Sequence, residues 1–302
     1  MRNAFADEIL SLALADERIV VLSGDIGNRL FDKFKAAMPE RFHNCGVAEA
    51  NMISLAAGLA SSGLRPVCYT ITPFVTTRCL EQIKLDVCYH SMPVTIIGTG
   101  SGLSYAALGS THHSFEDIAI MRCLPGMRIL APADAPELRN LLRSTFEQSS
   151  PTYLRIGKKG EPVLTEGRHF QPNRWQLMRK GNDATILSCG TILDEALAAA
   201  EALSADGIHV SVWNCATVKP LDLETLSSLF PAPVFTLEEH SILGGFGSAI
   251  AEVLSTYSSP PRLQRLGIPD IFLHDTGEQH ESRAHCGIDA AGIIKSVTAA
   301  LR

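Results

Sequence analysis

Residues 45–63 read CGVAEANMISLAAGLASSG, an apolar helix that carries a single acid at its start. Apolar side chains recur at helical spacing from Met52 to Leu59, and Gly63 provides a stop signal. Burying an unpaired charge costs free energy, so a buried helix rarely has an acid in its first turn without a partner. Glu49 is therefore predicted either to interact with the positive end of the helix dipole or to bind a ligand.

Predicted helices and strands alternate on both sides of this stretch, which indicates an α/β protein with parallel, doubly wound sheets. The first part has predicted strands at 19–23, 65–69, 94–98, 127–131 and 152–155, with helices at 3–15, 31–37, 79–89, 115–122 and from 135. The second part has predicted strands at 184–189, 209–215, 234–238 and 262–267, with helices at 192–205, 223–229 and 247–254.

The predicted domain organisation follows from this pattern. We expect one domain over residues 1–160, a linker rich in glycine and proline over 161–178, and a smaller α/β domain over 179–302. In open α/β sheets the functional loops lie at the carboxyl ends of the strands.

Composition narrows the function classes. The chain has 302 residues, of which 46% are hydrophobic and 19% charged, and a formal net charge of -6. This balance argues against a nucleic-acid partner, and no apolar run approaches the roughly 20 residues that span a bilayer. The eight cysteines are scattered through apolar segments without a CxxC pair, so we expect reduced thiols, no metal site and a cytoplasmic location.

Four segments together resemble one family. They are the Glu49 stretch, YTITPFVTTRCLEQIKLDV, the GSTHH loop with SFEDIAIMRCLPGMRILAPADAPE, and TLEEHSILGGFGSAIAEVL with LGIPD. They resemble, in order, segments of thiamine diphosphate enzymes of the transketolase and deoxyxylulose phosphate synthase group. The resemblance implies a pyrimidine-binding domain with a parallel sheet, followed by a transketolase C-terminal-like α/β domain.

The resemblance implies roles for the residues that match the family's cofactor site. Glu49 corresponds to the glutamate that hydrogen-bonds the aminopyrimidine ring and favours its imino form, so Glu49 is expected to be catalytic and cofactor-binding. Phe74 is expected to be the aromatic platform for that ring, because stacking adds on the order of 1 kcal/mol beyond area burial. Downstream, where many relatives carry further aromatics, this chain has Arg78, Cys79 and Leu80.

The resemblance also implies substrate contacts. His112 corresponds to the histidine that lies near the substrate carbonyl, where a neutral imidazole suits proton transfer. His113 replaces the family's glutamine, as a second polar contact or as a structural residue. Arg2, Arg29 and Arg155 lie in matching regions and are candidates for binding an anionic substrate end.

Two departures concern the substrate. The family's hydroxyl-reading aspartate falls on Leu108, and its phosphate-contacting histidine falls near Gly100. We therefore expect donors or acceptors other than the standard sugar phosphate pair.

A third departure concerns the partner. The family's Gly-Asp-Gly motif and later asparagine, which hold the diphosphate and Mg²⁺, have no counterpart; GDIGN at 24–28 instead predicts a turn with Asn28 or Arg29 toward substrate. The resemblance then implies a partner subunit with the diphosphate-binding domain and its Mg²⁺, and a heterotetramer containing a second copy of this chain.

Several alternatives stay open. The leading interpretation is the C-terminal subunit of a split transketolase that transfers a ketol unit between sugar-type substrates. A beta subunit of a 2-oxo acid dehydrogenase, another carboligase, or a non-catalytic scaffold would also fit the fold.

The turn before residue 247 is a weak candidate for a phosphate site. His240 could reach a substrate entrance, whereas His274, His280 and His285 indicate solvated surface rather than a metal site.

Overall fold

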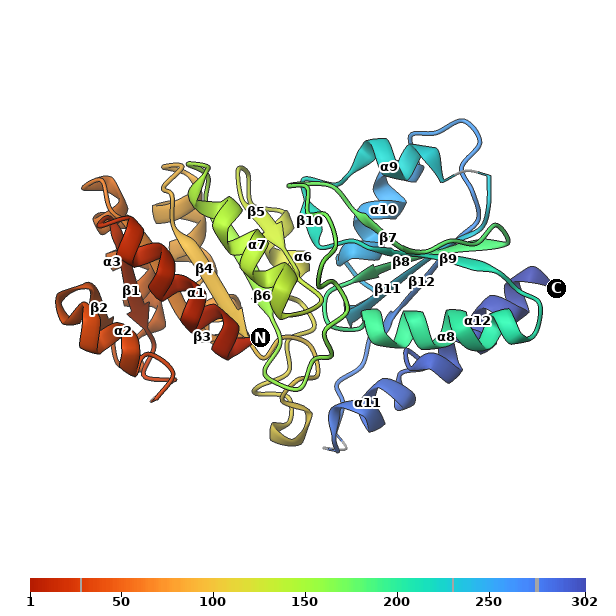
Figure 1. Ribbon diagram of the computed structural model, residues 1–302, viewed down its shortest axis with the longest axis horizontal. Helices are drawn as coiled ribbons and strands as arrows, with labels where there is room; N and C mark the ends of the chain where they lie inside the picture. The colour runs from red at the N-terminus through yellow and green to blue at the C-terminus, as the bar shows by residue number, and fades with distance from the viewer. Residues whose placement is uncertain (28, 230, 275–276) are drawn as a thin grey trace. The chain divides into compact units, whose positions relative to one another are not determined.

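The chain forms two units, each built around its own sheet, in a computed structural model that describes residues 1–27, 29–229, 231–274 and 277–302 (Figure 1). The first unit contains Met1–Ser101 and Ile120–Gly167, and the second contains Gly102–Ala119 and Arg168–Arg302. The predicted α/β class with two domains is confirmed, whereas the predicted domain limits stay predictions.

The sheet of the first unit is parallel, with the strand order β5-β6-β4-β3-β1-β2. Its central strands are buried along their whole length, which explains why they read as continuous apolar runs. The strands are β1 (Ile19–Ser23), β2 (Phe42–Asn44), β3 (Arg65–Ile71), β4 (Thr95–Thr99), β5 (Arg128–Leu130) and β6 (Thr152–Ile156).

Helices connect these strands, and α1 and α7 lie side by side (Figure 1). The buried carboxylate of Glu8 on α1 joins them, because it receives hydrogen bonds from Arg143 on α7 at 2.6 and 3.1 Å. The helices of this half of the chain are α1 (Arg2–Ala15), α2 (Asp32–Ala37), α3 (Glu49–Ser61), α4 (Thr72–Val75), α5 (Leu80–Gln82), α6 (Asp117–Arg122) and α7 (Ala135–Phe146), with 3-10 turns η1 (Pro39–Arg41) and η2 (Thr77–Cys79). The 3-10 turn η4 (Ala106–Leu108) and the first turn of α6 lie in the 102–119 segment of the second unit.

The prediction of a single helix over residues 79–89 is wrong in detail. The chain instead makes η2, then α5, then a π-helical segment, η3 (Ile83–Cys88). Ile83, Val87 and Cys88 are buried, and a π turn brings side chains at this spacing onto one face.

The sheet of the second unit has the order β12-β11-β8-β9-β7, in which only the pairing of β7 with β9 is antiparallel. Helices α8 and α12 pack together on one face, and α9 and α10 lie on the other (Figure 1). The strands of this sheet are β7 (Gln176–Arg179), β8 (Ala184–Cys189), β9 (Val210–Asn214), β11 (Val234–Ser241) and β12 (Leu263–Ile268), and the short β10 (Thr217–Lys219) lies outside it. The helices are α8 (Leu193–Ala205), α9 (Leu223–Ser228), α10 (Phe246–Leu254), α11 (Gln279–His285) and α12 (Ala290–Leu301).

Both ends of the expected linker are ordered by specific contacts. The Asp134 carboxylate, at the N-cap of α7, accepts hydrogen bonds from the backbone amides of Leu164 and Thr165, each at 2.6 Å. The other end of the 161–178 segment enters β7, which the irregular sequence pattern did not predict. In the described part of the chain, no helix is long and apolar enough to cross a membrane.

Candidate functional site

The carboxylate of Glu49 lies at the start of α3, where the sequence predicted it. The side chain is only 2% exposed. Space for it comes from Gly24, directly after β1, because a Cβ on Gly24 would come within 3.1 Å of the Glu49 Cγ and of the Thr70 Oγ1. Position 24 therefore favours the smallest residue, which leaves space for a buried acid at the carboxyl ends of β1 and β3.

Arg78 joins the two residues expected to bind the cofactor. Its Nη1 donates a 2.7 Å hydrogen bond to a carboxylate oxygen of Glu49, and its guanidinium carbon lies 4.3 Å from the ring centroid of Phe74. The Arg78 side chain is 45% exposed, so it covers the buried carboxylate from the solvent side. The sequence marked Arg78 only as a missing aromatic.

This cluster offers a flat group both an aromatic face and a buried carboxyl group. Here the planar guanidinium of Arg78 lies over the phenyl ring and hydrogen-bonds the carboxylate. The residues present therefore fit a flat heterocycle that lies on Phe74 and whose ring nitrogen shares a hydrogen bond with the Glu49 carboxyl group.

His112 lies on a loop, residues 102–119, that belongs to the second unit. Its Nδ1 is 2.9 Å from the Thr111 hydroxyl, and its ring packs edge-on against Tyr105 with centroids 6.0 Å apart. Partial burial, and to a lesser degree the neighbouring His113, lower the pKa of His112 below its ordinary value of 6.5. His112 is therefore neutral near pH 7, the form that accepts a proton.

His113 and Leu108 lie on the same loop. His113 is buried; its Nε2 is 3.0 Å from the carbonyl oxygen of Ala106, and its ring stacks on Phe115 at 5.1 Å. These contacts tie His113 to its own loop, and its part in substrate binding stays a prediction. Leu108, at the end of η4, is 52% exposed and offers an apolar surface where the family's aspartate is expected.

The three candidate arginines occupy different environments in the first unit. Arg2 donates from Nε to the carbonyl oxygen of Lys158 at 3.2 Å, Arg29 is exposed on the turn before α2, and Arg155 is buried in β6. In the adjacent turn, Asp25 accepts a 2.8 Å hydrogen bond from Asn44 on β2. Asn28, the other predicted substrate contact there, lies outside the described residues.

The glycine-rich turn before α10 binds a carboxylate of its own chain. The amides of Phe246 and Gly247 donate to Glu238 at 2.7 and 2.8 Å. Because the helix N-terminus is thereby neutralised, the weak prediction of a phosphate site at this turn loses its basis. His240 is also buried, and its Nε2 accepts the Ala119 amide at 3.3 Å. The buried His240 thus holds the end of the 102–119 loop, rather than reaching a substrate entrance.

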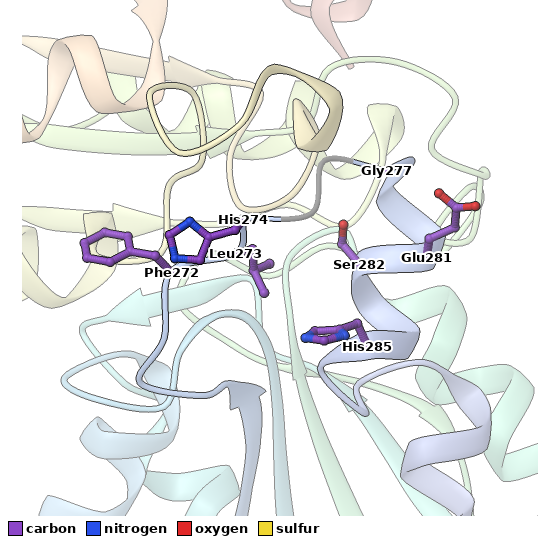
Figure 2. A pocket seen from close by; sticks show the side chains of 7 residues that line it. All are labelled: Phe272, Leu273, His274, Gly277, Glu281, Ser282 and His285. Carbon is purple, nitrogen blue, oxygen red and sulfur yellow. The ribbon is translucent and has the colours of Figure 1, made fainter.

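Two of the three C-terminal histidines line a pocket in the second unit. Figure 2 shows Phe272, Leu273 and His274 on the segment after β12, opposite Ser282 and His285 on α11. The pocket has a volume of about 420 Å³. No cluster of His, Cys, Asp and Glu suited to a metal ion occurs among the described residues.

Both units match family models. The chain matches the transketolase pyrimidine-binding domain over residues 1–161 and the transketolase C-terminal domain over residues 173–293. The chain therefore belongs to the transketolase family, a group of thiamine diphosphate-dependent enzymes, and the resemblance seen in the sequence is confirmed.

Relatives of similar length are separate subunits by name. The chain is 36% identical over 301 residues to one of the subunits of an apulose-4-phosphate transketolase of Phocaeicola vulgatus, covering 98% of this chain and 95% of that protein. It is 36% identical over 300 residues to "6-deoxy-6-sulfo-D-fructose transketolase subunit SqwH" of Clostridium sp. (strain MSTE9), covering 98% and 92%. A solved structure described as "Split gene transketolase, inactive beta4 tetramer" is 35% identical, with a TM-score of 0.89 and coverage of 99% and 97%.

Proposed function

We propose that this chain is one subunit of a two-chain transketolase that uses thiamine diphosphate to transfer a two-carbon ketol unit between sugar-type substrates. The observation that carries the proposal is the cluster of Glu49, Arg78 and Phe74. It combines a buried carboxylate, an aromatic face and a stacked planar donor in one place.

The proposed chemistry assigns a separate role to each of three residues. When bound, thiamine diphosphate supplies a thiazolium carbon that becomes nucleophilic on losing its proton. Glu49 holds a proton toward the pyrimidine ring nitrogen, and Phe74 supports the ring from one side. His112, neutral near pH 7, accepts a proton from a substrate hydroxyl and returns it on release.

The proposed partner is a separate N-terminal transketolase subunit that binds the diphosphate and Mg²⁺. Subunit-length relatives support this division, because the chain covers 95% and 92% of them. We further propose an assembly with two copies of each chain, related by twofold symmetry.

The proposed substrates are sugars with an anionic end, which an arginine such as Arg29 would bind. The names of the two relatives include a 4-phosphate sugar and a 6-sulfo sugar, so anionic ends of both kinds occur among similar proteins. Leu108, in place of a hydroxyl-binding aspartate, argues against the standard ketose phosphates.

Reconstitution tests this proposal. The chain is titrated with thiamine diphosphate and Mg²⁺ by calorimetry, alone and after assembly with the partner subunit, and proton–deuterium exchange at the thiazolium carbon is then measured. We expect tight binding and exchange only in the assembly. Tight Mg²⁺-dependent binding by the isolated chain would contradict the two-chain site, and an assembly without exchange would favour a scaffold role.

A further inference from the structure

The end of β11 holds both ends of the His112 loop. At the start of the loop, the Leu103 amide donates to the Glu239 carboxylate at 3.1 Å. Toward its end, the Ser241 amide donates to the carbonyl oxygen of Phe115 at 2.8 Å. Three consecutive residues of β11 therefore fix the loop, since His240 also receives the Ala119 amide.

Glu239 is the most heavily bonded of these residues. One carboxylate oxygen accepts from the Arg283 Nε at 2.8 Å and from the Gln279 Nε2 at 2.9 Å, while the other accepts the Leu103 amide. Glu239 is 1% exposed, and a buried carboxylate is retained only when such partners satisfy it.

The charge on Arg283 is also secured. Burial opposes the charge, but the carboxylates of Glu239, Asp194 and Glu195 outweigh that effect and raise the pKa of Arg283 above its ordinary value. Arg283 thus links the start of α8 to α11, and through Glu239 to the loop.

The loop transmits this anchoring to His112. Gly102 pairs with Ser114 across the neck of the loop through a 3.2 Å backbone hydrogen bond. Gly102 has φ +62° and lies so close to Glu239 that an added Cβ would collide with the carboxylate. Inside the neck, the amides of His112 and His113 both donate to the Gly109 carbonyl oxygen, at 3.0 and 3.2 Å. A shift of Leu103 or Gly102 therefore displaces the imidazole of His112.

We propose that Glu239, held by Arg283, is a positioning residue that fixes the catalytic placement of His112 by anchoring the start of the 102–119 loop. This inference rests on the proposed function, since it assumes that His112 acts on substrate. It gives the C-terminal unit a direct part in the reaction.

Glu239→Gln tests the proposal in the reconstituted complex. The amide keeps the shape of the carboxylate but has one acceptor oxygen facing three donors, so the loop start loosens. We expect kcat/KM for donor cleavage to fall about 10-fold or more, while exchange at the thiazolium carbon stays within about twofold of the unmodified complex. Arg283→Lys, with one ammonium in place of the planar fork, should show a smaller change in the same direction.

A second readout follows His112 directly. The rate at which diethyl pyrocarbonate modifies the His112 peptide is measured against pH by mass spectrometry. In the unmodified complex we expect a midpoint below 6.5, and in Glu239→Gln a midpoint shifted upward toward 6.5, because a loosened loop exposes the ring to solvent.

Glu224→Gln is the matched control, since Glu224 is an exposed acid of the same unit that pairs with Arg174. It should change none of these quantities. An unchanged His112 midpoint in Glu239→Gln, or donor cleavage and exchange that fall in equal proportion, would overturn the inference. If the unmodified complex shows no exchange at the thiazolium carbon, the proposed function is rejected. The pH midpoint of His112 modification would still show whether Glu239 positions His112.

Discussion

The Glu49 cluster and the His112 loop show two ways of holding a functional side chain. Glu49, Phe74 and Arg78 come from one short part of the chain, and Gly24 and β3 support them within the first unit. His112 follows β4 in sequence, yet its loop is held by Glu239 and Ser241, more than a hundred residues later. A local cluster can be recognised from a motif, whereas a loop that depends on distant anchors is defined only by the fold.

The largest expected effect tests the local side of this comparison. Glu49→Gln keeps the side-chain volume, so folding and assembly should change little. Proton–deuterium exchange at the thiazolium carbon, measured on the reconstituted complex, should slow by at least roughly 100-fold through loss of an acid–base contribution. Glu40→Gln, which alters an exposed acid of the same unit, is the control. Exchange as fast as in the unmodified complex would reduce Glu49 to a structural residue.

The next effect tests the loop. His112→Asn should reduce kcat/KM for donor cleavage by about 5–150-fold, the range for a lost hydrogen bond of 1–3 kcal/mol, without slowing the exchange step. Because burial and His113 lower the pKa of His112, the neutral, proton-accepting imidazole is fully present above pH 6.5 and is lost as the pH falls through the lowered pKa. The acid limb of the profile of kcat/KM against pH should therefore lie below pH 6.5. An acid limb unchanged in His112→Asn would assign that ionisation to another group.

A smaller effect concerns substrate choice on the loop surface. Leu108→Asp places a hydroxyl-binding acid at a position that is 52% exposed, so its cost in stability should be small. Turnover of xylulose 5-phosphate should rise about 5-fold, which corresponds to roughly one hydrogen bond of 1 kcal/mol. Steady-state rates with and without the substitution decide this. If the unmodified enzyme already matches an ordinary transketolase on this sugar, Leu108 does not set specificity.

The smallest effect returns to the Glu49 cluster. Arg78 pairs with Glu49 and covers Phe74, and thus competes for the surfaces proposed for the pyrimidine ring. Arg78→Met should tighten thiamine diphosphate binding to the complex by at most about 5-fold, because a half-exposed ion pair contributes only about 0.2–1 kcal/mol. Titration calorimetry measures the change. Weaker binding in this variant would instead make Arg78 a ligand of the cofactor.

The sequence-based predictions succeeded for elements that their own residues define and failed for elements that depend on contacts with distant residues. The strands β1, β4 and β8 were predicted because buried parallel strands read as apolar runs. The short strand β2 and the antiparallel β7 were not, because pairing with a neighbour defines them more than their own pattern does. The helix α11 was missed because its N-cap is Glu278 and not the serine or threonine of the usual pattern, although Glu278 and Glu281 form a capping box in the structure.

The candidate site divides in the same way. Glu49 and Phe74 were identified by motif, and Arg78 joins them in one cluster. Their roles stay predictions that the experiments above test. Arg78 was seen as a departure and not as a partner, because no rule of spacing joins a residue after β3 to the start of α3. Glu239 and Arg283 carried no recognisable signal, since an acid in a strand and an arginine in a short helix are ordinary until the fold pairs them.

The membership of residues 102–119 in the second unit bears on how this protein can be taken apart. A cut in the 161–178 segment would place the loop on the N-terminal fragment and its anchors, Glu239 and Ser241, on the C-terminal one. Expressed separately, one fragment would carry an untethered loop, and in the other Glu239 would lose the amide of Leu103 while keeping Arg283 and Gln279. For dissection and for chimeras between relatives, the interchangeable piece is the C-terminal half together with residues 102–119.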